Sequence, residues 1–301
     1  MVSRPSLNGK RRRKLWINCL LNTRKGWLSL YETIKTDLED GILTLTLNRP
    51  DKMNAYTEQM NEELLQFYKE VNNDDNVRVI VVTGSGRAFC AGMDLSEGGS
   101  TFSSEQSSED YRDLGGQVSL EVYKVNKPII AAINGPAVGI GMTMTLPMDI
   151  RIVKKDTKIG FVFGRRGIGP EAGSGWFLPR VVGIGKALEW TLTGRYIPTA
   201  EAVETGLMQY ESEDPLAKAY EIARDIVENT AATSNSFTRQ LLWKMLGQEH
   251  PLESHLIESK FLHWAGQNAD ADEGIQAFVD KRKAEFPMKA SELPDFFSEH
   301  K

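Results

Sequence analysis

The pattern of apolar and polar residues divides the chain into a first half rich in strands and a second half rich in helices. Residues 31–36 and 41–48 alternate and carry β-branched side chains, which predicts a hairpin that turns around Glu39-Asp40-Gly41. Continuous apolar runs at 77–83 and 127–134 are typical of buried strands. Shorter strand patterns follow at 149–153 and 158–163.

Helical spacing first occurs at 57–71, behind a candidate N-cap at Thr57. Beyond residue 173 the pattern is mostly helical. The expected helices span 174–182, 186–193, 199–205, 214–229, 233–246, 252–267 and 272–285. Strand–helix alternation followed by helices predicts an α/β core with a helical C-terminal part. We therefore expect an extension at 1–30, a core at 31–230 and a helical region at 231–301.

The composition is that of an ordinary globular protein, with 41% hydrophobic and 26% charged residues. A net charge of −5 gives no bias toward nucleic acid, and no apolar stretch approaches the ~18 residues of a membrane span. We expect neither a nucleic-acid partner nor a span. Cys19 and Cys90 are too few for a disulfide framework or a zinc site, which favours a reducing, intracellular compartment.

The first thirty residues are basic, with no acid before Glu32. Such a segment is consistent with an organelle presequence; a disordered basic tail or an incorrect gene start is the alternative. The compartment stays open between mitochondrial, peroxisomal and cytoplasmic. The chain ends in Ser298-Glu299-His300-Lys301, which is not the peroxisomal S-K-L signal.

Several familiar kinds of site are missing from the sequence. All four histidines lie in the last fifth of the chain, and no serine stands in G-x-S-x-G, so a serine hydrolase triad has little support. No G-x-G-x-x-G follows a strand pattern, which weakens a dinucleotide site. We expect no metal and no separate cofactor.

Three glycine-bearing turns remain, each after an apolar strand pattern. They are R-A-F-C-A-G-M-D at 87–94, N-G-P-A-V-G-I-G at 134–141 and R-R-G-I-G-P-E-A-G at 165–173. Glycine lets backbone approach a ligand, and a turn that enters a helix offers free N–H groups at the positive end of the helix dipole. Two such turns facing each other could hold an oxyanion. By spacing alone, ordinary strand-to-helix turns are the simpler interpretation.

Four segments resemble, in order, the motifs of the enoyl-CoA hydratase/isomerase (crotonase) superfamily. The segments at 87–94 and 126–141 are similar to its two signatures. The segment at 47–55, L-N-R-P-D-K-M-N-A, is similar to its first CoA-contacting segment. The segment at 273–286, E-G-I-Q-A-F-V-D-K-R-K-A-E-F, is similar to its C-terminal helix. The resemblance implies a spiral of ββα units with a helical C-terminal trimerisation region, in a homotrimer or hexamer. The substrate would be an acyl-CoA thioester, in which CoA is part of the substrate.

The resemblance also assigns roles to residues. The backbone amides of Met93 and Ile140 would hold the thioester oxygen and bind it more strongly as an enolate forms. CoA would lie against Lys52, Asn54, Ala55 and Ala91. Phe278 and Lys281 of a neighbouring subunit would flank the adenine end.

Glu171 is the candidate acid/base. Its position alone favours an ordinary first-turn glutamate next to a helix dipole, whereas the resemblance assigns it the single catalytic carboxylate of isomerases. Burial beside a substrate would raise its pKa toward working pH. The two glutamates of the best-known hydratase pattern are absent, since Thr143 and Phe163 stand at their positions.

The sequence therefore predicts an enzyme that isomerises 3-enoyl-CoA to 2-enoyl-CoA. A hydratase that uses Glu171 and a bound water is the first alternative. A family member that binds CoA without this activity, or one that catalyses thioester hydrolysis or decarboxylation on the same scaffold, remains open.

Overall fold

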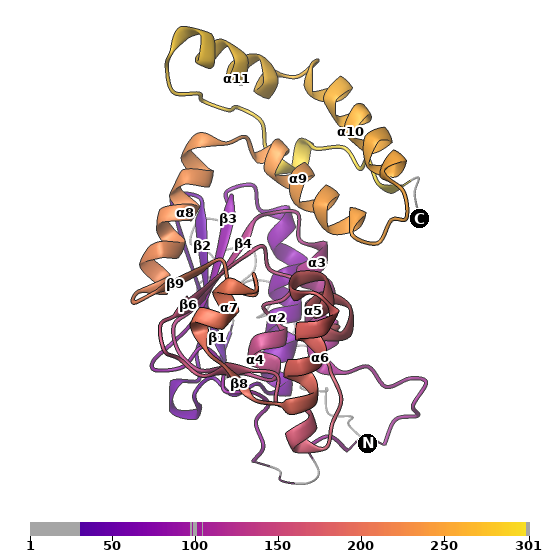
Figure 1. Cartoon of the computed structure of the whole chain (residues 1–301). Helices are drawn as coiled ribbons and strands as arrows, with labels where there is room; N and C mark the ends of the chain where they lie inside the picture. The colour runs from indigo at the N-terminus through magenta and orange to yellow at the C-terminus, as the bar shows by residue number, and fades with distance from the viewer. Residues whose placement is uncertain (1–30, 97, 99–100, 104, 299–301) are drawn as a thin grey trace, which may run out of the picture.

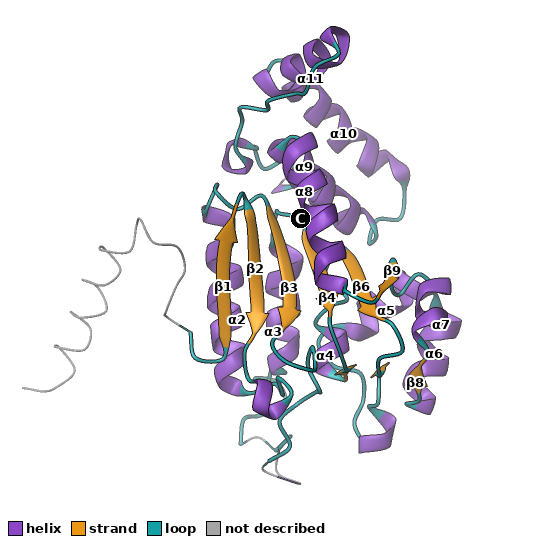
Figure 2. Ribbon diagram, turned by 90° about the vertical axis from the view of Figure 1, so that its left-hand side faces the viewer, coloured by secondary structure: helices purple, strands orange, loops and turns teal. Residues whose placement is uncertain are grey.

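A computed structural model of the chain describes residues 31–96, 98, 101–103 and 105–298 (Figure 1). The basic extension at 1–30, with the interpretations attached to it, lies outside the described residues. Over the described part, a six-stranded sheet forms the centre of the molecule, in the order β1-β2-β3-β4-β6-β9 (Figure 2). These strands are β1 (Ile34–Glu39), β2 (Ile42–Leu47), β3 (Val79–Gly84), β4 (Ile129–Ile133), β6 (Ile150–Lys154) and β9 (Tyr210–Ser212).

The pairing of the strands brings two of the glycine-bearing turns to one edge of the sheet. β1 and β2 form the expected antiparallel hairpin, and every later neighbour in this sheet pairs in parallel. The carboxyl ends of β3 and β4 therefore point the same way, and the turns after them begin side by side. A smaller sheet, β5-β7-β8, follows from the second turn. Its strands are β5 (Ala137–Val138), β7 (Ile159–Gly160) and β8 (Tyr196–Ile197).

Helices cover both faces of the large sheet. Alternate strand residues such as Leu45 and Val82 pack with α2 (Glu58–Glu70) and α3 (Leu114–Lys124), while Val81 and its neighbours pack against α8 (Pro215–Asn229). Burial on both faces explains the continuous apolar runs of β3 and β4. Thr57 caps α2 as predicted, because its hydroxyl accepts a hydrogen bond from the Met60 amide at 3.2 Å.

The remaining helices form two groups. The first group lies beside the smaller sheet and consists of α4 (Ile140–Thr143), α5 (Ser174–Val182), α6 (Ile184–Thr193) and α7 (Thr199–Glu204). The second group extends beyond the sheet and consists of α9 (Ala232–Met245), α10 (Pro251–Ala265) and α11 (Ala269–Asp280) (Figure 1). Short 3-10 turns occur at η1 (Pro50–Lys52), η2 (Val71–Asn73), η4 (Gly164–Arg166) and η5 (Ala290–Glu292). None of the helices described is long and apolar enough to cross a membrane.

The last predicted helix is displaced. The pattern predicts a helix at 272–285, whereas α11 ends at Asp280. Lys281 adopts a left-handed conformation, with φ of 55°, and caps the helix. Arg282 then folds back to bind Glu273 at 2.6 Å, so the apolar pattern that continues to Phe286 belongs to an extended segment.

Candidate active site

Two of the glycine-bearing turns run side by side and in register. Cys90 and Ala137 form a parallel bridge, in which the Cys90 amide donates to the Pro136 carbonyl and the Val138 amide donates to the Cys90 carbonyl, both at 3.1 Å. Three residues further along each turn stand Met93 and Ile140. The register of the bridge therefore brings these two residues to the same level.

The amide of Met93 faces away from its neighbouring strand segment. In the parallel bridge between Tyr56 and Met93, the Tyr56 amide donates to the Gly92 carbonyl and the Asp94 amide donates to the Tyr56 carbonyl, both at 2.8 Å. This alternation leaves the Met93 N–H on the opposite side. Among the described residues it has no acceptor.

The amide of Ile140 likewise has no acceptor in the described part of the chain, for a different reason. Ile140 is the first residue of α4, and the first N–H groups of a helix have no acceptor within the helix. The residue before each of the two amides is a glycine with positive φ, 111° at Gly92 and 56° at Gly139. A side chain at either position would be strained, which explains why both turns need glycine here.

Both amide-bearing residues and Glu171 line one small apolar chamber. Its other walls include Val138, Val162 and Phe163. A wider cleft of about 1040 Å³ shares Met93 and Glu171 with this chamber. That volume is sufficient for a large ligand, since ligand pockets are typically ~300–1,000 Å³. The structure thus brings together the three residues predicted to be catalytic.

The carboxyl group of Glu171 is held between two helices. The Thr143 hydroxyl on α4 donates to Oε1 at 2.6 Å. Gly115 on α3 faces the other oxygen, because a Cβ added there would lie 2.7 Å from Oε2. The pKa of Glu171 is raised to about 7, chiefly by burial; the Thr143 hydrogen bond lowers it, and the nearby charge of Asp113 adds to the rise. A carboxyl group with this pKa can take up and release a proton near neutral pH.

The residues predicted to contact CoA divide into two sets. Ala91 lines the chamber wall, whereas Lys52, at the end of η1, is exposed and Ala55 follows in the next loop. The Asn54 side chain is fully buried and donates to the carbonyls of Ser85 and Ala88, both at 2.9 Å. Asn54 therefore joins two loops and has no amide hydrogen free for a ligand.

Phe278 and Lys281 belong to the second set. They stand at the end of α11, and α11 lies at the opposite end of the molecule from α4 (Figures 1 and 2). Phe278 is 85% exposed. Within one chain neither residue reaches the chamber, so their predicted contact with CoA requires a neighbouring subunit.

Two other acids serve structural contacts, Asp94 beside the chamber and Asp149 at the amino-terminal start of β4, away from it. Asp94 forms an ion pair with Arg49 at 2.9 Å, and this contact holds the pKa of Asp94 below its usual range. Asp149 accepts hydrogen bonds from Arg239 and Trp243, both at 2.8 Å. Neither acid is left with an unpartnered carboxylate to act in the chamber.

Sequence reasoning missed three residues that surround Glu171. Thr143 was noted only as a departure from the hydratase pattern, and Asp113 and Gly115 were not singled out. An acid before a Leu-Gly-Gly run is a helix-cap signal that could have identified Asp113. Nothing local in the sequence connects it to Glu171.

Comparisons with known proteins identify the family to which the chain belongs. The model of one protein family, enoyl-CoA hydratase/isomerase, matches residues 37–289. An enoyl-CoA hydratase of Alternaria alternata is 40% identical over 251 residues, 82% of this chain and 83% of that protein. The 1,2-epoxyphenylacetyl-CoA isomerase of Escherichia coli (strain K12) is 33% identical over 272 residues, 86% of this chain and 100% of that protein. The crystal structure of an enoyl-CoA hydratase from Bacillus anthracis has a TM-score of 0.79 at 30% identity, covering 85% of this chain and 99% of that one. These matches confirm the predicted family and fold.

Proposed function

Because this chain belongs to the enoyl-CoA hydratase/isomerase family, we propose that it moves the double bond of a 3-enoyl-CoA to the 2-position through a thioester enolate. That the protein is an acyl-CoA enzyme of this family follows from the comparisons alone. The choice of isomerisation depends on one observation. Among the described residues that line the small chamber, Glu171 is the one carboxylate, and it lies beside both free amides.

The two amides would stabilise the charge that forms on the substrate. When a proton leaves C2, negative charge moves onto the thioester oxygen. Donors from Met93 and Ile140 would bind that oxyanion more strongly than the neutral carbonyl, which lowers the barrier. One well-placed donor of this kind is typically worth about 3–4 kcal/mol.

Glu171 would carry the proton between two carbons. Its carboxylate removes a proton from C2, and the electron pair of that C–H bond enters the conjugated enolate. The protonated carboxyl group then returns the proton to C4, while the double bond settles between C2 and C3. No other acid or base is required, and the pKa of about 7 suits both half-reactions.

Hydration is the second candidate, because relatives that are 40% identical carry the name enoyl-CoA hydratase. In that reaction Glu171 would take a proton from a water that attacks C3 of a 2-enoyl-CoA; the enolate of the 3-hydroxyacyl thioester would form on the same two amides and would then be protonated at C2. The positions of both hydratase glutamates are occupied by Thr143 and Phe163, so a single carboxylate would have to serve both steps.

Product analysis separates these reactions. The protein is incubated with 3-hexenoyl-CoA and with crotonyl-CoA, and the products are examined by chromatography and mass spectrometry. Isomerisation changes retention at constant mass, hydration adds one water, and thioester hydrolysis releases free CoA. Glu171→Gln should abolish turnover, whereas Glu249→Gln, a matched change at an exposed glutamate, should not. Undiminished turnover in Glu171→Gln would exclude the mechanism.

A further inference from the structure

One oxygen of Asp113 joins two segments that are far apart in the sequence. Its Oδ2 accepts a hydrogen bond from the Gly116 amide at 2.6 Å, which caps the start of α3. The same oxygen accepts a second bond, at 3.0 Å, from the amide of Ala172. Ala172 follows Glu171 directly, so the cap of α3 is also a tether for the loop that carries Glu171.

The tethered loop has a conformation that it would not adopt by default. Ala172 is fully buried and has a φ of 55°, in the left-handed region that side-chain-bearing residues rarely occupy. Such a residue persists where its surroundings determine its backbone. The bond from its amide to Asp113 is one such determinant. A second is the bond from the Ser174 amide to the Glu171 carbonyl, at 2.9 Å.

We infer that Asp113 is a positioning residue for Glu171, which sets the place of the Glu171 carboxyl group by fixing the following residue to the start of α3. The inference rests on the proposed role of Glu171. It explains why Gly115, two residues after Asp113, can lie directly against the Glu171 carboxyl group. Without the tether, the loop and the α3 terminus would be free to separate.

Asp113 also acts on Glu171 through its charge. It raises the pKa of Glu171, secondary to burial. The other titratable groups that face Glu171 are Tyr56, whose pKa burial raises well above its usual value, and Cys90, whose pKa burial raises to about 12. Both are neutral near pH 7, and Arg166 also lines the chamber. Removing the charge of Asp113 therefore lowers the pKa of Glu171.

Two substitutions of Asp113 separate position from charge. Asp113→Asn keeps an oxygen acceptor and removes the charge; it should retain most of kcat and move the midpoint of the kcat/KM profile to lower pH. Asp113→Ala removes both hydrogen bonds and should lower kcat by about 10- to 100-fold with KM within about twofold, because small misplacements of a reacting group have effects of this size. Greater activity in the Asn variant than in the Ala variant is the expected rescue.

Asp214→Ala provides the matched control. Asp214 caps α8 through a 3.0 Å bond from the Ala217 amide, far along the chain from Glu171. If Asp113 served only as a helix cap, Asp113→Ala and Asp214→Ala would lower Tm by similar amounts and leave kcat unchanged. That result, or an Asp113→Asn variant no more active than Asp113→Ala, overturns the inference. Failure of the proposed function gives a different result, since Glu171→Gln would then remain active regardless of the effects of the Asp113 substitutions.

Discussion

The fold disfavours the charged form of the Glu171 side chain, and this has a measurable effect on stability. Its pKa rises from 4.5 in an unfolded chain to about 7 in the folded protein, mainly through burial. The folded state therefore binds the proton more tightly, and stability falls as the pH rises from about 4.5 to 7. Glu171→Gln stays neutral, so at pH 8 it should be more stable than the wild type by roughly 2–3 kcal/mol.

Chemical denaturation at several pH values tests this expectation. The difference between Glu171→Gln and the wild type should be present at pH 8 and disappear near pH 4. The exposed Glu249→Gln variant should show no such pH-dependent gain. A constant difference across the range would mean that the Glu171 carboxylate is solvated in the folded protein.

Gly115 leaves room for the carboxyl group of Glu171. A methyl group at this position would lie 2.7 Å from Glu171 Oε2 and would also press on the end of the Ile140 side chain. A third neighbour, the Cβ of the buried and tethered Ala172, would lie 3.1 Å away. Gly115→Ala should therefore lower kcat/KM by at least about tenfold, while overpacking, which typically costs ~1–3 kcal/mol, offsets the helix preference of alanine.

The control for Gly115→Ala is the same substitution in another helix. Gly185 lies in α6, and a Cβ added there meets nothing within 4 Å. Gly185→Ala should gain the helix preference of alanine without overpacking and leave kcat/KM intact. Equal activity in the two variants would show that the Glu171 carboxyl group does not depend on the space at Gly115.

Local motifs reveal only part of the site. Met93 and Ile140 each follow a glycine in a segment that resembles a family signature, so the resemblance could assign their amides to the site. Asp113 acts on a residue 59 positions away, and a separation of that size leaves no trace in local spacing. Thr143 shows the same limit. The sequence shows that threonine stands where the hydratase pattern has a glutamate, but it does not show the hydrogen bond from Thr143 to Glu171, 28 positions away.

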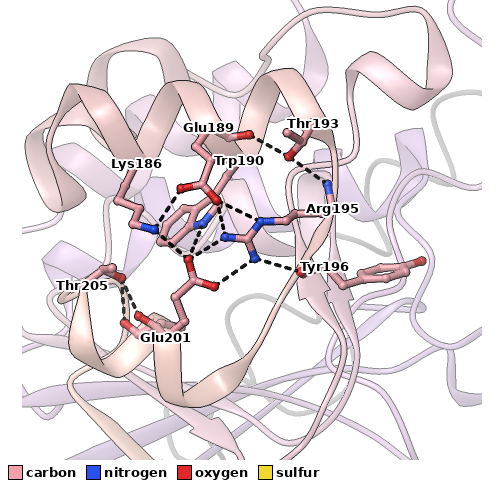
Figure 3. A network of polar contacts seen from close by, with 9 residues as sticks. Lys186, Glu189, Trp190, Thr193, Arg195, Tyr196, Glu201 and Thr205 are labelled. Atoms are coloured by element: carbon pink, nitrogen blue, oxygen red, sulfur yellow. Dashed lines mark hydrogen bonds and ion pairs between the residues drawn. The ribbon is translucent and has the colours of Figure 1, made fainter.

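An ion-pair network joins α6 to α7 at the level of secondary-structure elements (Figure 3). Glu201 on α7 accepts hydrogen bonds from Arg195 at 2.6 Å, Lys186 at 3.0 Å and the Trp190 indole at 3.1 Å. These contacts, led by Arg195, lower the pKa of Glu201 to about 2. The stabilisation that ionised Glu201 contributes to the folded protein is therefore complete above about pH 4.5 and is lost as the pH falls toward 2.

Glu201→Gln should lower the free energy of unfolding by about 1 kcal/mol at pH 7, at the upper end for a surface pair because several partners are involved. The loss should shrink as the pH falls below 4.5. Glu213→Gln is the control, since Glu213 is 81% exposed and lies 4.0 Å from Lys155. If both variants unfold at the same denaturant concentration as the wild type, the network in Figure 3 does not stabilise the α6–α7 contact.

The predicted elements are most accurate where periodicity is strong. α5 spans 174–182 and α8 spans 215–229, within one residue of the predicted bounds, because each has a clear apolar face and a glycine or an Asp-Pro cap at its start. β8 and β9 were not predicted. They contain two and three residues, too few for any period, and they exist only because β7 and β6 offer partners.

At the scale of the whole molecule, exposed apolar residues lie on α6 and on the helices that extend from the core. Leu192 on α6 is 76% exposed; on α10 and α11, Phe278 is 85% exposed, Leu262 69% and Ile275 66%. Clusters of exposed apolar side chains mark protein interfaces. This pattern is consistent with the predicted homotrimer or hexamer, in which α11 would lie near the chamber of another subunit.

The position of α11 leads to a test of the predicted CoA contact. Phe278→Ala combined with Lys281→Ala should raise KM for an acyl-CoA by about tenfold, and leave kcat unchanged, because the lost contacts are made equally in the ground and transition states. An acyl-pantetheine lacks the adenine nucleotide, so its KM should not change. A rise for both substrates would place the effect at the acyl chamber instead.

Mixed oligomers decide whether the contact comes from a neighbour. Co-expression of the double variant with Glu171→Gln produces sites in which an intact Glu171 from the first chain faces an intact α11 from the second. If α11 acts between subunits, such hybrids regain a population of sites with the wild-type KM, although neither parent has one. If α11 acts within its own chain, every subunit with an active Glu171 keeps the damaged α11. The hybrids then show only the raised KM, which would contradict the arrangement, because α11 lies far from α4 within one chain (Figure 1).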